Sequence, residues 1–118
     1  MSQSMMKKCP TIVIAVMLWC LLLASSANCE TVEVQIIKSA FIPAVVTIKQ
    51  GDTVRWLNMD GLLHTVTSGK APLPDDKFNA PFVLKKFDTK FEKVGFVDYF
   101  CAIHNVTMRG VIIVEEKK

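Results

Sequence analysis

The sequence predicts an all-β fold, a sandwich or barrel of seven to eight short strands. Three observations support this prediction. Apolar and polar residues alternate with a period of two along much of the chain, polar or glycine-containing turns separate the alternating segments, and no long helical repeat is present. Period-two alternation is typical of half-buried strands, and many short strands with polar turns are typical of two-layer or closed β folds.

Residues 1–27 are expected to be a cleaved signal peptide, which leaves residues 28–118 as one exported domain. The charged pair Lys7–Lys8 is followed by apolar sequence from Ile12 to Leu23 and by a small-residue stretch that ends at Ala27. This three-part order is typical of secretory signals, and we expect cleavage after Ala27. The expected location is the periplasm.

Two membrane-attached forms are alternatives to this cleavage. The apolar run falls short of the ~20 residues that a membrane-spanning helix needs, so an uncleaved anchor is disfavoured. Lipid attachment at Cys29 is also disfavoured, because Asn28 and Ser26 fit a lipoprotein signal poorly. We therefore expect no membrane span after cleavage.

The first strands of the domain follow from simple alternation. Thr31–Ile37 places Val32, Val34 and Ile36 on one face. A second strand is expected at Val45–Ile48, and a third at Thr53–Asn58. The turn between them contains Gly51 and is short, so the second and third strands are predicted to form a hairpin.

The remaining elements are shorter or less regular. Leu84, Phe87 and Phe91 are spaced like one face of a helix, but Phe87, Thr89 and Phe91 also alternate, and the strand is favoured because its neighbours are strands. In chain order we expect a strand at His64–Thr67, a proline-rich surface loop at Ala71–Asp75, an extended stretch at Phe82–Phe91, and strands at Phe96–Cys101 and Gly110–Val114.

The charge balance argues against a nucleic-acid partner. The chain has 14 lysines and arginines and 11 acidic residues; without Lys7 and Lys8 the balance is 12 against 11, a formal charge of +1. There is no basic stripe and no interleaving of aromatic and basic residues of the kind that phosphate binding requires. We expect a monomer without strong electrostatic steering toward its partners.

The metal-binding chemistry of the exported domain is concentrated in few residues. Cys9 and Cys20 lie in the expected signal peptide, so the domain keeps Cys29 and Cys101, which could form a disulfide in an oxidising compartment. We favour Cys101 as a metal ligand instead, because its neighbours have the spacing of a ligand loop.

The two histidines of the chain frame this cysteine. His104 follows Cys101 by three residues, Met108 follows His104 by four, and His64 lies at the start of an earlier predicted strand. A thiolate and two imidazoles with a distant thioether are typical of electron-transfer copper sites, whereas structural zinc usually has four strong ligands. Taken singly, each residue could be an ordinary core or polar side chain. Together they predict one copper ion per chain. The sequence contains no nucleic-acid-binding or hydrolase motif that would suggest another function.

These motifs resemble those of a known family. Tyr99–Gly110, with Trp56–Asp60 leading to His64, is similar to the small blue copper proteins, or cupredoxins, and most similar to their plastocyanin, amicyanin and pseudoazurin branch. The resemblance covers Thr31 to Val114. It implies a Greek-key β-sandwich with copper at one end, held by His64, Cys101 and His104 in a plane with Met108 as a weak axial ligand.

The sequence departs from the family pattern at two places. Three residues separate His104 from Met108, where the family commonly has two or four. Thr65 replaces an asparagine that commonly ties the two ligand loops together, and Ala102 offers no hydroxyl. We therefore expect fewer hydrogen bonds around the ligands than the family usually has.

The resemblance implies an electron shuttle that cycles between Cu(I) and Cu(II). The electron would leave through His104, ringed by exposed apolar residues that suit brief docking to redox proteins such as a cytochrome or a copper- or quinone-linked enzyme; these residues are Leu62, Leu63, Ile103 and Val106. The alternative is a copper delivery or storage protein on the same fold. An enzyme is not expected, because copper enzymes of this fold need further histidines.

Overall fold

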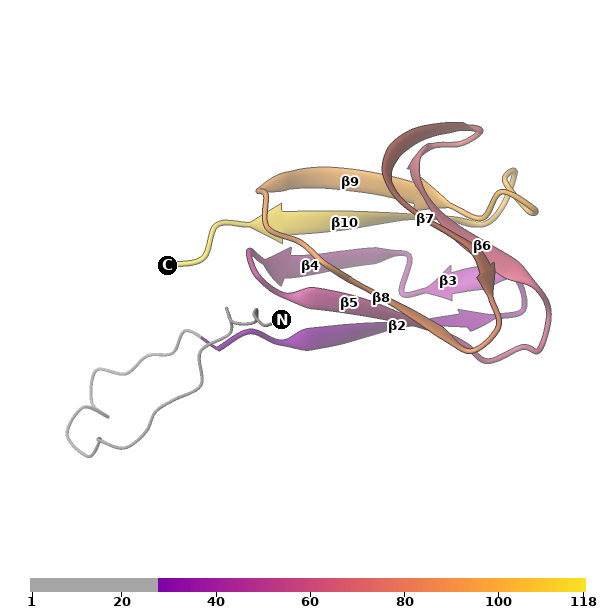
Figure 1. Cartoon of the computed structure of the whole chain (residues 1–118), viewed down its shortest axis with the longest axis horizontal. Helices are drawn as coiled ribbons and strands as arrows, with labels where there is room; N and C mark the ends of the chain where they lie inside the picture. Colours follow the sequence, from indigo (N-terminus) through magenta and orange to yellow (C-terminus); the bar gives the residue numbers. More distant parts are fainter. Residues whose placement is uncertain (1–27) are drawn as a thin grey trace.

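The computed structural model describes residues 28–118, which form nine strands and no helix (Figure 1). The expected signal peptide, with its cleavage site, lies outside the described residues. Because this part of the chain has no helix, it has none that could cross a membrane. The all-β prediction is confirmed.

The strands form two packed sheets. One has five strands in the order β4-β10-β9-β6-β7, namely Val45–Lys49, Arg109–Glu115, Gly95–Phe100, His64–Lys70 and Leu73–Val83. The other has four strands in the order β3-β2-β5-β8, namely Ala40–Ile42, Thr31–Ile37, Thr53–Asn58 and Lys86–Lys90. The short strand β3 was not predicted from the sequence, because three residues are too few to show a period.

The predicted hairpin between the second and third segments is wrong. β4 pairs with β10 in parallel, whereas β5 pairs with β2 in parallel and with β8 in antiparallel orientation. The connecting turn therefore crosses from one sheet to the other. Asp52 stabilises this corner, since its carboxylate accepts the backbone N–H of Lys49 at 3.0 Å and of Glu30 at 2.9 Å.

Part of the proline-rich segment is a strand and not the expected surface loop. Instead of a loop at Ala71–Asp75, β7 begins at Leu73 and forms with β6 a hairpin that curls away from the sandwich (Figure 1). Pro74 is tolerated there because β7 is an edge strand, and the β6–β7 register shifts twice. The stretch Phe82–Phe91 is extended, as favoured, but it is divided between β7 and β8.

The core lies between the two sheets and is built from the alternating apolar positions. Trp56 on β5 and Tyr99 on β9 are 0% and 1% exposed and meet in a T-shaped contact, with ring centroids 5.2 Å apart. Gly110 on β10 leaves the space that Tyr99 fills, because a Cβ atom there would collide with the tyrosine ring. This packing fixes β9 and β10, the strands on either side of the predicted ligand loop.

Candidate metal centre

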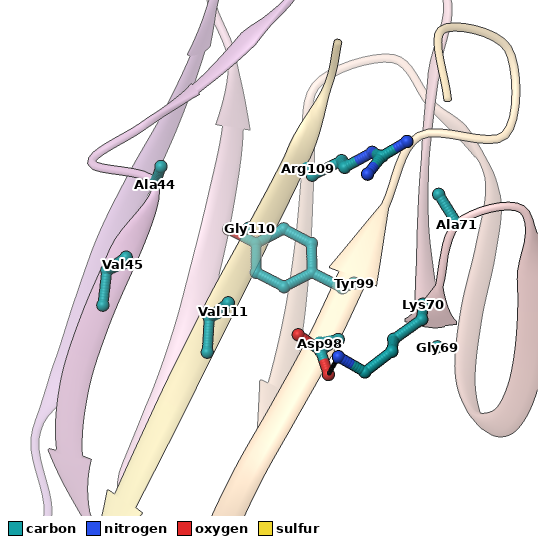
Figure 2. A pocket seen from close by; sticks show the side chains of 10 residues that line it. All are labelled: Ala44, Val45, Gly69, Lys70, Ala71, Asp98, Tyr99, Arg109, Gly110 and Val111. Carbon is teal, nitrogen blue, oxygen red and sulfur yellow. Dashed lines mark ion pairs between the residues drawn. The ribbon is translucent and has the colours of Figure 1, made fainter. Parts of the chain in front are cut away.

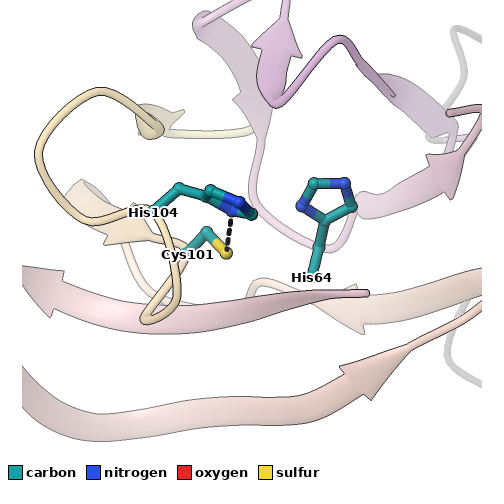
Figure 3. Close-up of side chains that lie close together, drawn as sticks. All are labelled: His64, Cys101 and His104. Carbon is teal, nitrogen blue, oxygen red and sulfur yellow. Dashed lines mark hydrogen bonds between the residues drawn. The ribbon is translucent and has the colours of Figure 1, made fainter. Parts of the chain in front are cut away.

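Three of the four predicted ligands meet at the end of the sandwich opposite the C-terminus (Figures 1 and 3). His64 begins β6, Cys101 follows β9, and His104 lies in the loop between β9 and β10. One ligand atom from each lies within 4.8 Å of the others. His64 and Cys101 are fully buried, whereas His104 is partly exposed.

The ligand loop is closed by its own backbone hydrogen bonds. The N–H of Cys101 donates to the carbonyl of Met108 at 3.0 Å, and the N–H of Met108 donates to the carbonyl of His104 at 2.9 Å. Three residues between His104 and Met108 are accommodated by this turn. Met108 is 0% exposed and lies at the base of the loop opposite Cys101, within the core cluster.

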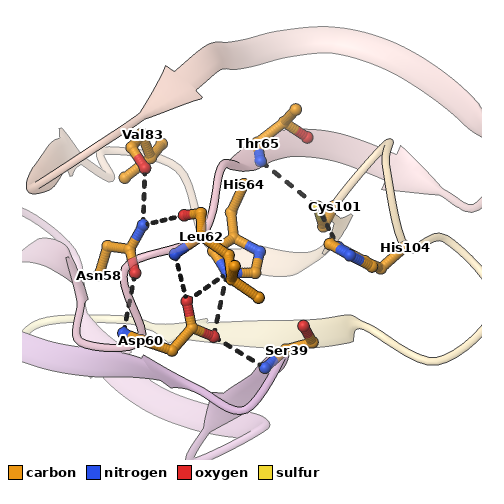
Figure 4. A network of polar contacts seen from close by, with 9 residues as sticks. All are labelled: Ser39, Asn58, Asp60, Leu62, His64, Thr65, Val83, Cys101 and His104. Atoms are coloured by element: carbon orange, nitrogen blue, oxygen red, sulfur yellow. Dashed lines mark hydrogen bonds and ion pairs between the residues drawn. The ribbon is translucent and has the colours of Figure 1, made fainter.

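His64 has one ring nitrogen engaged and the other without a partner. Its Nε2 lies 2.8 Å from Oδ1 and 3.1 Å from Oδ2 of Asp60 (Figure 4). A carboxylate can only accept a hydrogen bond, so Nε2 carries the proton. Nδ1 is then an unprotonated nitrogen that is buried without a hydrogen-bond partner.

An unsatisfied buried nitrogen costs about 1–3 kcal/mol, which a bound metal ion would relieve. The donor set of two imidazoles and a thiol is one that copper prefers. The residues present therefore fit a copper ion.

Asp60 is held in place from three directions. Its carboxylate also accepts the N–H of Ser39 at 2.9 Å and the N–H of Leu62 at 3.0 Å. Partial burial raises the pKa of Asp60, but the hydrogen bonds from Ser39, Leu62 and His64 outweigh it and lower the pKa to about 2. The carboxylate is therefore ionised at neutral pH.

Cys101 is a free, buried cysteine, so the alternative disulfide with Cys29 is not formed. The backbone N–H of Thr65 points at its sulfur at 3.4 Å, and Nδ1 of His104 lies 3.5 Å from the same atom. The sulfur therefore has a nitrogen neighbour on each of the two ligand segments.

Thr65 engages both of its polar groups next to the ligands. Its N–H reaches Cys101, and its hydroxyl accepts the N–H of Ala102 at 2.7 Å. The chain of contacts continues from Thr65 to the hydroxyl of Thr67 at 3.0 Å, and from Thr67 to Asn79 at 2.8 Å. These bonds tie the two ligand segments together.

Four apolar side chains that neighbour the ligands in the sequence are exposed at the surface. They are exposed on the two loops that carry the ligands: Leu62 at 54%, Leu63 at 40%, Ile103 at 51% and Val106 at 78%. All four were singled out from the sequence.

A surface pocket of about 340 Å³ lies elsewhere, between the β6–β7 hairpin and strands β9, β10 and β4 (Figure 2). Its polar lining consists mainly of Lys70 and Asp98, which form an ion pair at 3.6 Å, and Arg109. No histidine or cysteine lines it. The metal-binding chemistry of the described residues is therefore at the His–Cys–His cluster.

Sequence reasoning missed Asp60. A metal-bound histidine usually donates its second ring N–H to a carboxylate or carbonyl. The position of Asp60, four residues before His64, is the signal that could have identified it.

Comparison with known proteins agrees with this site. The family model of the cupredoxin-like domain matches residues 10–114. The chain belongs to the cupredoxin family. Amicyanin from Paracoccus versutus is 35% identical over 94 residues, which is 78% of this chain and 70% of the relative. Chloroplastic plastocyanin from Tetradesmus obliquus is 35% identical over 106 residues, or 79% of this chain and 72% of the relative.

The fold is shared with solved cupredoxin structures. A Cu(I) form of an amicyanin variant superposes with a TM-score of 0.63 at 29% identity, covering 72% of this chain and 82% of the other. The purple cupredoxin from Nitrosopumilus maritimus shares the fold with a TM-score of 0.65 at 24% identity, covering 71% of this chain and 99% of the other. This cupredoxin is a copper-binding electron-transfer protein and not an enzyme.

Proposed function

We propose that this cupredoxin is an exported electron shuttle with a single type 1 copper, which His64, Cys101 and His104 would hold together with Met108 as a weak fourth ligand. The observation that carries the ligand set is the buried, unpartnered Nδ1 of His64 beside the other two donors. Met108 completes the set because its fully buried side chain begins at the base of the same loop.

When bound, copper supplies a one-electron couple between Cu(I) and Cu(II). The two oxidation states prefer different geometries, so the protein favours rapid transfer by keeping the donors in one arrangement. His64 is held by Asp60, the loop by its internal turns, and the two ligand segments by Thr65. Little reorganisation is then needed in either direction.

The electron would enter and leave through His104. Among the three clustered donors it is the one that is partly exposed, whereas His64 and Cys101 are fully buried. The exposed apolar side chains on both loops would suit a small, transient contact with a redox protein, such as a cytochrome or a copper- or quinone-linked enzyme. Such a shuttle would act as a monomer.

The proposed location is the periplasm, after cleavage behind Ala27. The support is the three-part N-terminal pattern of charge, apolar run and small residues. Intact mass measurement of the protein recovered from a periplasmic extract should give a chain that begins at Asn28. A mass that retains residues 1–27 would contradict cleavage.

The test of the copper site is spectroscopic. The chain from Asn28 onward, given one equivalent of Cu(II), should show an intense blue absorption and a narrow copper hyperfine splitting in the EPR spectrum, and ascorbate should bleach the colour reversibly. Cys101→Ser should abolish the blue band, because it removes the thiolate, whereas Cys29→Ser should leave it unchanged.

A pale spectrum with wide hyperfine splitting, or copper that a mild chelator removes at once, would contradict an electron shuttle. That result would favour copper delivery or storage. A blue band that survives in Cys101→Ser would contradict the assignment of the sulfur ligand.

A further inference from the structure

Asp60 is a partly buried carboxylate that no proposed ligand role explains. Its side chain is 11% exposed, and that of its partner His64 is 0% exposed. In the described part of the chain, no lysine or arginine forms an ion pair with it; its ionic contact is with His64. This placement puts the negative charge of the carboxylate next to a proposed metal ligand.

We propose that Asp60 is a positioning residue that fixes the tautomer and orientation of His64 and, through its charge, holds the reduction potential of the copper site low. This inference rests on the proposed function, since it concerns the copper that His64 would bind. It adds a determinant of the potential that lies outside the four ligands.

The geometry of the loop before β6 supports the positioning role. Asn58, at the end of β5, donates from its side chain to the carbonyls of Leu62 at 2.7 Å and Val83 at 2.9 Å, which fixes the loop against β7 (Figure 4). The side-chain oxygen of Asn58 accepts the N–H of Asp60 at 3.1 Å. The backbone of Asp60 is therefore held at the loop's centre.

A second segment orients the carboxylate itself. The turn between β2 and β3 places Lys38 and Ser39 in the left-handed region, with φ of 51° and 56°, and the N–H of Ser39 donates to Oδ2 of Asp60. Non-glycine residues adopt this region at some cost, so the surrounding structure must stabilise the turn. Oδ1 in turn accepts the N–H of Leu62, so both carboxylate oxygens are held while they face Nε2 of His64 at 2.8 and 3.1 Å.

The consequence for the imidazole is chemical. Because Nε2 donates to Asp60, Nδ1 is left unprotonated and directed at the donor cluster (Figure 3). A carboxylate behind a ligand histidine also makes the imidazole a stronger donor.

The consequence for the potential follows from charge. Cu(II) carries one more positive charge than Cu(I), so a nearby negative charge stabilises the oxidised state more. Removal of a residue that supports a metal ligand typically lowers metal affinity by about 10- to 100-fold. Neutralising Asp60 should therefore weaken Cu(II) binding more than Cu(I) binding.

The experiment has one arm that needs no copper. In the apo protein at neutral pH, ¹⁵N NMR of the imidazole rings should show His64 in the Nε2–H tautomer. The partly exposed His104 serves as the internal comparison, because its Nε2 has no carboxylate partner among the described contacts. An Nδ1–H tautomer at His64 would overturn the positioning role. This measurement tests the positioning role of Asp60 even if the wild-type protein is not blue and the proposed function fails.

The second arm measures the potential by voltammetry. Asp60→Asn has nearly the same shape and keeps an oxygen acceptor, but it removes the charge. We expect the Cu(II)/Cu(I) affinity ratio to fall about tenfold, which raises the potential by about 59 mV for a one-electron couple.

The matched control is Asp76→Asn, which removes the same charge from an exposed position on the β6–β7 hairpin; asparagine also tolerates the φ of 67° found there. The control should keep the wild-type potential. An unchanged potential in Asp60→Asn, or an equal rise in both variants, would overturn the proposal.

Discussion

The contribution of Met108 to the copper potential can be tested apart from its contribution to folding. A thioether is a weak donor, and leucine replaces methionine in a core at nearly equal volume. Met108 is fully buried at the base of the ligand loop. Met108→Leu should therefore fold, keep the blue absorption and raise the potential, by about 59 mV for each tenfold fall in the Cu(II)/Cu(I) affinity ratio, since it removes thioether donation to Cu(II). Voltammetry of the two proteins measures this. An unchanged potential would exclude Met108 as a ligand.

Tyr99 gives a prediction that is independent of copper. Burial raises the pKa of this phenol from 10.0 to about 12, and it is the single tyrosine of the chain, so its ultraviolet titration is unambiguous. The folded state holds the phenolic proton more tightly than the unfolded state does. This group therefore adds about 2–3 kcal/mol to the free energy of unfolding below pH 10, and this contribution is lost as the pH rises from 10 to 12.

The measurement is urea unfolding at several pH values alongside the phenolate absorbance. Tyr99 should cause no pH dependence of the free energy of unfolding below pH 10, and it should cause a fall above pH 10. Ionisation near pH 10 in the native protein would contradict the buried, protonated state of Tyr99.

Individual residues differ in how far the sequence predicts them. His64, Cys101 and His104 could be identified because the chain has only two histidines and the spacing around the cysteine is informative. Asp60 gives a weaker signal, namely its position four residues before His64. Its role depends on a hydrogen bond from Ser39, 21 residues earlier, and on a loop that folds back toward His64.

At the scale of elements, Thr65 on β6 links the first ligand strand to the ligand loop. Thr65→Val keeps the shape and the backbone N–H that reaches Cys101, but it removes the acceptor of the Ala102 N–H. Leaving that N–H without a partner should destabilise the protein by about 1–3 kcal/mol and speed copper release to a chelator. Thr65→Ser retains the hydroxyl and should behave like wild type.

Urea unfolding and the rate of copper transfer to a chelator measure the two effects. If Thr65→Val and Thr65→Ser released copper at the same rate, the side chain would not be what ties the loops together. The backbone contact between Thr65 and Cys101 would then suffice.

Strand positions were more predictable than strand partners. Alternation identified β2, β4, β5, β9 and β10, because burial of one face repeats every two residues. The hairpin predicted between β4 and β5 failed because a tight turn joins neighbours in sequence without specifying the sheet. Asp52 stabilises the turn between β4 and β5 by accepting the backbone N–H of Glu30. This contact spans 22 residues, so no local sequence pattern shows it.

For the molecule as a whole, the small core makes bound copper a sizeable part of the stability. A domain of this size buries only ~60–70% of its unfolded surface, so its core is marginal. A ligand that binds the folded state alone adds about 2.7 kcal/mol when present at 100 times its dissociation constant. For a domain of this length, that corresponds to a rise of about 10 °C or more in Tm.

Thermal unfolding followed by circular dichroism, with and without one equivalent of copper, tests this. The wild-type Tm should rise on copper addition, because copper binds the donor set that only the folded chain assembles. Cys101→Ser should show a much smaller shift, because its folded state lacks the sulfur donor. Each shift is measured against the apo form of the same protein, so that the cost of burying a serine hydroxyl in place of the thiol cancels. Equal shifts in both proteins would mean that copper stabilises the fold from somewhere other than the His–Cys–His cluster.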